Sequence, residues 1–164
     1  MSPILNDDMK RLVREQRLGY VATVSPDGKP NLSPKGSLTV WDDDHLMFAD
    51  IESPRTIKNL SGNPNTDVNV VDPFVRKGYR FKGTCTVERT GAKYWKAIEM
   101  YKADGGDVRR VRAIVFIRVT SVMPLLSPVY LLGLTDQEVA RLWEEYHSKS
   151  AQKTVSDLIP PSDF

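Results

Sequence analysis

The sequence predicts a mainly β fold, in which short antiparallel strands form a small barrel with helices on its flanks. Short runs rich in β-branched and aromatic residues recur at even spacing, and turn-forming residues such as Pro26-Asp27-Gly28 separate them. From Tyr79 to Glu88 apolar or small residues alternate strictly with polar ones. These observations favour a meander of hairpins over an open parallel sheet.

The composition is that of one globular domain. The chain has 164 residues, of which 40% are hydrophobic and 27% charged, and its net charge of +2 gives no reason to expect nucleic acid or an anionic membrane as a partner. No apolar run approaches the ~20 residues of a membrane helix, and the first residues do not resemble a signal peptide. We therefore expect a cytoplasmic protein with no membrane partner.

The first half of the chain predicts one helix followed by a strand meander. Asn6 is a good N-cap, an apolar stripe follows it, and Gly19 is expected to end the helix. The turn at Asp42-Asp43-Asp44 is interpreted as a solvated hairpin tip. Strands are expected at residues 20–24, 31–34, 36–41 and 46–49.

The second half alternates strands with helices. A short helix is expected from Ser53 to Asn63, and a second from Gly91 to Asp104 with Tyr94, Trp95, Ile98 and Tyr101 on its buried side. A capping box at Thr135 to Glu138 predicts a last helix. Strands are expected at residues 66–71, 79–88 and 113–119. We predict a barrel domain over residues 1–134, and a C-terminal helix and tail over residues 135–164 that packs on the barrel or on a partner subunit.

The most informative stretch runs from Ser33 to Lys58. Arg55 and Lys58 fall in the first turns of the short helix, and Lys35 lies on a preceding strand. Hydroxyl groups accompany these bases at Ser33, Ser37, Ser53 and Thr56. Cations are unfavourable at a helix N-terminus unless an anion lies between them and the helix end. The pattern predicts an anion site, although a solvated surface with scattered bases explains it equally well on these grounds alone.

An ordered set of motifs surrounds this stretch. The segment from Gly28 to Pro34 has the pattern G-x-P-x-x-S-P, and a later strand ends in Phe48-Ala49. The helix from Ser53 closes with Asn59-Leu60-Ser61-Gly62-Asn63-Pro64. Gly83 follows on the long strand. Over about residues 5 to 120, the set resembles the FMN-binding core of the pyridoxamine 5′-phosphate oxidase-like split-barrel family.

The resemblance implies a six-stranded antiparallel split β-barrel that forms a homodimer, with flavin mononucleotide (FMN) at the subunit interface. Lys35 and Ser37 would line the isoalloxazine and ribityl side, and Ser33 and Ser53 belong to the same cofactor site. Arg55, Thr56 and Lys58 would hold the phosphate. Asn69 or Arg80 of the second subunit would complete the site.

The sequence departs from the pyridoxamine phosphate oxidases themselves. The strand before Lys35 lacks their arginine, Thr56 replaces a lysine, and no substrate-recognition segment follows Thr120. The resemblance is therefore to flavin-nucleotide-binding members of the family other than the vitamin B6 enzyme. It implies an FMN-dependent oxidoreductase that acts on a small molecule, with a nicotinamide nucleotide as a candidate electron donor. The alternatives are a non-catalytic flavin-binding or electron-transfer protein, and a relative that binds deazaflavin F420 or haem.

Other chemistry is not indicated. Cys85 is the single cysteine and alternates with apolar residues, so we interpret it as a packed core thiol rather than a nucleophile. His45 and His147 have no partner at ligand spacing, so no metal site is predicted. No side chain is assigned a catalytic role.

Overall fold

A computed structural model describes residues 3–151 of the chain. Contacts divide it into two compact units: one comprises Met1–Val71 and Gly78–Leu125, and the other comprises Asp72–Lys77 and Leu126–Phe164. The first unit contains the sheet. The predicted tail beyond Ala151 lies outside the described residues, and its place on the barrel or on a partner subunit stays a prediction.

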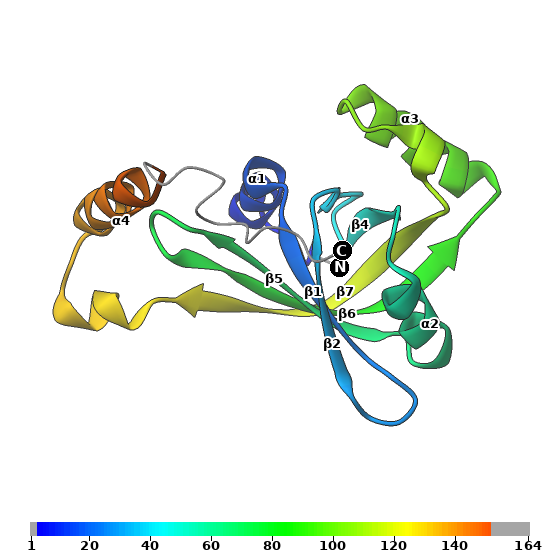
Figure 1. The fold of residues 1–164 in the computed structure, drawn as a ribbon, viewed down its shortest axis with the longest axis horizontal. Helices are drawn as coiled ribbons and strands as arrows, with labels where there is room; N and C mark the ends of the chain where they lie inside the picture. Colours follow the sequence, from blue (N-terminus) through cyan, green and yellow to red (C-terminus); the bar gives the residue numbers. More distant parts are fainter. Residues whose placement is uncertain (1–2, 152–164) are drawn as a thin grey trace, which may run out of the picture. The chain divides into compact units, whose positions relative to one another are not determined.

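The first unit is built on one curled antiparallel sheet, whose strands run in the order β2-β1-β5-β6-β7-β4-β3 (Figure 1). The prediction of a mainly β antiparallel fold is confirmed. The strands are β1 (Gly19–Val24), β2 (Pro30–Lys35), β3 (Thr39–Val40), β4 (His45–Asp50), β5 (Asn65–Asp72), β6 (Lys77–Glu88) and β7 (Ala113–Leu126). The sheet has seven strands rather than the expected six.

The strand expected over residues 36–41 is reduced to the two residues of β3. The reason is that the side chain of Ser37 takes the place of backbone hydrogen bonds to β4. Ser37 Oγ accepts a hydrogen bond from the Ala49 N–H at 3.0 Å and donates one to the Ala49 carbonyl at 3.3 Å. Because these bonds satisfy both backbone groups of Ala49, the chain at Gly36 and Ser37 can turn instead of pairing.

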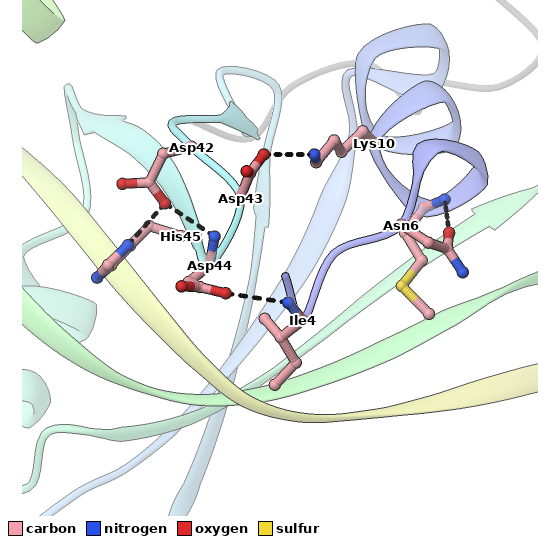
Figure 2. Close-up of polar contacts among 8 residues, drawn as sticks. Ile4, Asn6, Lys10, Asp42, Asp43, Asp44 and His45 are labelled. Atoms are coloured by element: carbon pink, nitrogen blue, oxygen red, sulfur yellow. Dashed lines mark hydrogen bonds and ion pairs between the residues drawn. The ribbon is translucent and has the colours of Figure 1, made fainter. Parts of the chain in front are cut away.

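The helices are α1 (Asp7–Gln16), α2 (Pro54–Gly62), α3 (Ala92–Ala103) and α4 (Asp136–Ala151), with 3-10 turns η1 (Val108–Arg110) and η2 (Pro128–Leu132). Asn6 caps α1 as predicted, because its Oδ1 accepts from the Met9 N–H at 2.9 Å (Figure 2). The expected stop at Gly19 is wrong. Arg17 ends the helix in the left-handed conformation with φ 50°, and Gly19 begins β1.

The core lies on both faces of β4. Leu46 and Phe48 pack inside the curled sheet with residues of α1, β1, β6 and β7. Met47 and Ala49 pack on the opposite face, against Phe116 of β7 and the buried side of α3. That side of α3 consists of Tyr94, Ala97 and Ile98. The predicted burial of Trp95 is wrong, since its side chain is 59% exposed.

The turn at Asp42-Asp43-Asp44 binds the N-terminal segment rather than only solvent (Figure 2). Asp44 Oδ1 accepts from the Ile4 N–H at 3.0 Å, and the Asp43 carboxylate pairs with Lys10 at 2.5 Å. Asp42 Oδ1 lies 2.8 Å from Nδ1 of His45. These contacts anchor the start of the chain and hold His45 in place.

The structure adds two negative findings on residues 3–151. No helix in this range is long and apolar enough to cross a membrane. Within the same range, no group of three or more His, Cys, Asp or Glu side chains could hold a metal ion. Cys85 is buried in the core, and this burial raises the pKa of its thiol to about 12, as expected for a packing role.

The second unit contains α4 and the hairpin at residues 72–77. Thr135 and Glu138 form the predicted capping box, with the Thr135 N–H donating to Glu138 Oε2 at 2.8 Å. The guanidinium of Arg76 lies 3.5 Å from the ring centroid of Trp143. This cation–π contact joins the hairpin to α4.

Gly83 allows β6 and β7 to approach closely. A Cβ atom at this position would lie 2.4 Å from the carbonyl oxygen of Arg118 and 2.8 Å from Cγ2 of Ile117. Both neighbours belong to β7. The carbonyl oxygen of Arg118 is a backbone atom, so a change of rotamer cannot move it away. This position therefore requires glycine.

Gly83→Ala is expected to lower the free energy of unfolding by about 1–3 kcal/mol, because the added methyl group forces the two strands apart. Urea denaturation followed by circular dichroism measures the change. Gly62→Ala is the control, since a Cβ there would meet only Cγ of Pro26 at 3.9 Å. Equal stability of Gly83→Ala and the wild type would contradict the close approach.

Candidate functional site

The centre of the candidate site is a buried lysine. The side chain of Lys35 comes from the end of β2, and the residue is 4% exposed. Its Nζ donates to Ser33 Oγ and to Ser53 Oγ, each at 2.6 Å. Ser53 directly precedes α2. The Lys35 ammonium therefore joins the end of β2 to the start of α2.

Two features of its surroundings shift the pKa of Lys35 in opposite directions. Burial lowers the pKa of the ammonium, and the nearby carboxylate of Asp50 opposes that shift. Asp50 is 5% exposed, and its Oδ1 accepts from the Ser53 N–H at 3.1 Å. An ammonium has three N–H donors, and two acceptors are present among the described residues. The ammonium also lies 5.6 Å from the ring centroid of Phe48, and this cation–π contact accepts no conventional hydrogen bond, so one donor remains for a ligand.

The N-terminus of α2 is open to an anion. Ser53 occupies the N-cap position, but its side chain caps no backbone N–H, and Pro54 has no N–H to offer. In the described part of the chain, the backbone N–H groups of Arg55 and Thr56 have no acceptor. The side chains of Arg55 and Lys58 are exposed beside them. Free N–H groups, the helix dipole and two cations together favour an anion.

A small polar cluster lies beneath α2. Thr23 Oγ1 accepts from the side-chain amides of Asn31 at 3.2 Å and of Asn59 at 3.1 Å. The Asn31 amide also lies 3.4 Å from Oγ1 of Thr56, which is 1% exposed. The Thr56 hydroxyl therefore faces the protein, and its backbone N–H faces the helix end.

Two hollows flank the start of α2. One, of about 410 Å³, is lined by Lys35, Ser37 and Ser53 together with Ala49 and Tyr101. We call it the Lys35 hollow. The other, of about 370 Å³, is lined by Arg55 and Lys58 with the turn residues from Ser25 to Asn31, and we call it the Arg55 hollow.

The seven predicted site residues thus divide into groups. The Lys35 hollow brings together Lys35, Ser37 and Ser53, and Ser33 joins them through its bond to Lys35. Arg55 and Lys58 line the Arg55 hollow, and Thr56 is buried between the helix and Asn31.

The two residues expected from a second subunit lie on neighbouring strands. Arg80 of β6 donates from Nε to Asn69 Oδ1 of β5 at 3.0 Å. Their contribution to a partner's site stays a prediction.

Sequence reasoning missed four polar residues of this region, namely Thr23, Asn31, Asp50 and Asn59. Asp50 had a local signal, because an Asp three residues before a serine N-cap can accept the backbone N–H of that serine. The other three meet only through the pairing of β1 with β2 and the packing of α2. No local pattern in the sequence reports those contacts.

Comparison with known proteins gives two relatives with appreciable identity. An uncharacterized protein of Methanocaldococcus jannaschii is 30% identical over 118 residues, which cover 69% of this chain and 76% of that protein. The crystal structure of HupZ from Group A Streptococcus superposes with a TM-score of 0.68 at 31% identity, and the match covers 75% of this chain and 95% of that one.

Two more distant structures share the fold alone. An FMN-binding protein from Syntrophomonas wolfei superposes with a TM-score of 0.60 at 13% identity, covering 71% of this chain and 82% of its own. A protein named F420 reductase superposes with a TM-score of 0.58 at 20% identity, covering 73% and 98%.

The family model described as pyridoxamine 5′-phosphate oxidase matches residues 5–122. That match spans the sheet up to β7, together with α1, α2, α3 and both hollows. The chain belongs to the family that this model describes, pyridoxamine 5′-phosphate oxidase.

Proposed function

We propose that this protein binds FMN at the start of α2 and is an FMN-dependent oxidoreductase that acts on a small molecule. The observation that carries the proposal is the Lys35 ammonium, which is buried between two serine hydroxyls and retains a donor for a ligand. It lies beside a helix N-terminus whose side-chain cap is missing. A family that includes FMN-binding proteins supports the choice of cofactor.

The residues at the start of α2 fit the phosphate of FMN. Arg55 offers a guanidinium fork, Lys58 offers a second positive charge, and the N–H groups of Arg55 and Thr56 offer free donors. In this proposal Thr56 contributes its backbone rather than its hydroxyl, which is bonded to Asn31. The dipole of α2 adds to the attraction.

The residues of the Lys35 hollow fit the uncharged part of a flavin. Lys35 would donate a hydrogen bond to the ring system, Ser37 Oγ has one lone pair left to accept from a ribityl hydroxyl, and Tyr101 offers an aromatic wall. Bound FMN would supply the hydride chemistry, and a cation beside the ring would favour its reduced, more negative form. The burial of Lys35 keeps that cation away from water, which strengthens its effect on the ring.

A homodimer is part of the proposal, and the outer face of β1 and β2 supports it. Tyr20 and Val24 of β1 are 47% and 39% exposed, and Leu32 of β2 is 65% exposed. Pairing places Ala22 opposite Leu32 and Tyr20 opposite Pro34, so these apolar side chains share one sheet face. A contiguous exposed apolar face of this kind favours a protein partner, here a second copy of the chain.

Arg55→Ala is expected to weaken FMN binding about ten-fold or more while leaving riboflavin binding unchanged, because only FMN carries the phosphate. Quenching of flavin fluorescence measures both affinities. Arg89→Ala removes an exposed arginine outside both hollows and serves as the control. Equal losses for FMN and riboflavin would remove Arg55 from the phosphate site.

Catalysis separates the proposed oxidoreductase from a passive flavin carrier. FMN-loaded protein is expected to oxidise NADH or NADPH in air faster than free FMN at the same concentration, as followed by the loss of nicotinamide absorbance. A rate equal to that of free FMN with both donors would favour the non-catalytic carrier. The fold neighbour named F420 reductase supports reduced F420 as a third donor, whose oxidation is followed by the return of deazaflavin absorbance.

Leu32→Asp is expected to convert a dimer into a monomer, because it places a charge in the apolar face. Light scattering after size-exclusion chromatography measures the mass. Thr90→Asp, which adds the same charge at an exposed position in the connection between β6 and α3, is the control. A wild-type monomer that binds flavin fully would overturn the interface site.

A further inference from the structure

A third hollow adjoins the Lys35 hollow, and the proposed function does not use it. It has a volume of about 320 Å³ and lies between α1, the connection from β2 to β3, and α3. Two arginines of α1, Arg14 and Arg17, line it together with Trp41, Met100 and Tyr101. We call it the arginine hollow. Its lining combines aromatic surfaces with positive charge.

The aromatic walls of the arginine hollow are held in fixed orientations. The ring of Trp41 packs edge-on against Phe116, with ring centroids 5.0 Å apart. Tyr101 lies against the backbone of Gly106, where a Cβ atom would come within 2.4 Å of its ring. The Gly106 N–H also donates to the Tyr101 carbonyl at 2.9 Å. A ligand therefore meets two preformed aromatic surfaces.

The two arginines differ in their contacts. Arg17, which ends α1, donates from Nη2 to the backbone carbonyl of Asp104 at 3.1 Å, and this bond ties its guanidinium to the end of α3. Arg14 has no hydrogen bond or ion pair with any residue in the range 3–151. Its guanidinium is therefore available to a ligand. With the carboxylate of Asp104 on the same lining, the hollow carries one net positive charge.

The arginine hollow is a neighbour of the Lys35 hollow. Gly36, Ser37 and Tyr101 line both of them. A Cβ atom at Gly36 would meet no other atom within 4 Å, so the space beside this residue is open. A molecule in the arginine hollow would lie next to whatever occupies the Lys35 hollow.

These observations specify a ligand class. A volume near 320 Å³ is at the small end of ligand pockets, which run from about 300 to 1,000 Å³. It suits one or two fused rings better than a nucleotide. Aromatic walls favour a flat ring, and one net positive charge with a free guanidinium favours a single carboxylate.

We propose that the arginine hollow binds a small aromatic monocarboxylate, with Arg14 as the residue that recognises the carboxylate. The role of this ligand as the substrate of a bound flavin rests on the proposed function, because it depends on FMN in the adjoining Lys35 hollow. The binding site itself depends only on residues of α1, α3 and the segment from Gly36 to Trp41.

The test compares 2-naphthoate with its uncharged analogue 2-naphthamide by isothermal titration calorimetry. The protein is used as the full chain, with and without saturating FMN. Three proteins are titrated: the wild type, Arg14→Gln and Arg11→Gln. Arg11 lies on the same helix one turn earlier and outside the hollow, and its two ion pairs, with Asp8 and Glu15, are exposed. Arg11→Gln therefore makes the same charge change near the hollow at a small cost in stability. FMN affinity is measured separately for each protein.

The wild type is expected to bind 2-naphthoate about ten-fold more tightly than 2-naphthamide, and Arg14→Gln is expected to abolish that preference. Arg11→Gln should bind both compounds as the wild type does. Because Arg14 has no internal partner and only its charge in the last turn favours the end of α1, its replacement should lower the thermal unfolding temperature by no more than about 4 °C. FMN affinity should be equal in all three proteins.

Three results would overturn the proposal. They are equal affinity of the wild type for the two compounds, an equal loss of 2-naphthoate binding in Arg11→Gln, and a loss of FMN affinity in Arg14→Gln. The last would assign the hollow to the flavin itself. Selective 2-naphthoate binding by a protein that does not bind FMN would support the site while contradicting the proposed function, so the two failures are distinguishable.

Discussion

The buried ammonium of Lys35 is the interaction on which the candidate site depends. A charge with so little exposure requires hydrogen-bond acceptors, and the hydroxyls of Ser33 and Ser53 supply them. Because Ser53 accepts from Lys35, its side chain does not cap α2. The helix start consequently keeps free N–H groups beside Arg55. One buried cation therefore both closes the end of β2 against α2 and leaves an anion-binding helix end.

The two faces of β2 have different functions in this account. Asn31, Ser33 and Lys35 lie on the side that meets α2, where their polar atoms find partners. Leu32 and Pro34 lie on the opposite side and are exposed. The strict alternation of a β-strand separates these sets, so one short strand can carry a cofactor site and an apolar interaction face.

Much of the fold could be predicted from local signals. Asn6, Gly62 and the Thr135–Glu138 capping box mark helix ends, and the alternation in β6 marks its buried side. Two of the errors, the strand at residues 36–41 and the burial of Trp95, come from contacts between distant segments. Ser37 replaces a strand ladder by bonding to Ala49, and Trp95 is exposed because α3 turns Tyr94, Ala97 and Ile98 toward β4 and β7. The hydrophobicity of residues along α3 does not show that Tyr94 is buried and Trp95 is exposed.

In the candidate site too, local sequence signals predict one part, and contacts between distant segments determine the rest. The stretch from Ser33 to Lys58 predicts an anion site through its bases and hydroxyls, and the family resemblance implies that the anion is the phosphate of FMN. The burial of Lys35, the support from Asp50 and the polar cluster around Thr23 depend on how β1, β2 and α2 meet. The arginine hollow depends likewise on the approach of α1 to α3. Single-sequence patterns do not contain that information.

The most direct test of the central claim is the cofactor that the purified protein carries. Visible absorption of the untreated protein, followed by mass analysis of the molecule released on denaturation, measures it without an assumed substrate. If FMN binds beside Lys35 at the start of α2, the purified protein is yellow and releases FMN, or it is colourless and turns yellow and gains thermal stability when FMN is added. Release of F420 or haem would contradict FMN binding. So would a colourless protein that does not quench the fluorescence of added FMN and gains no thermal stability from it.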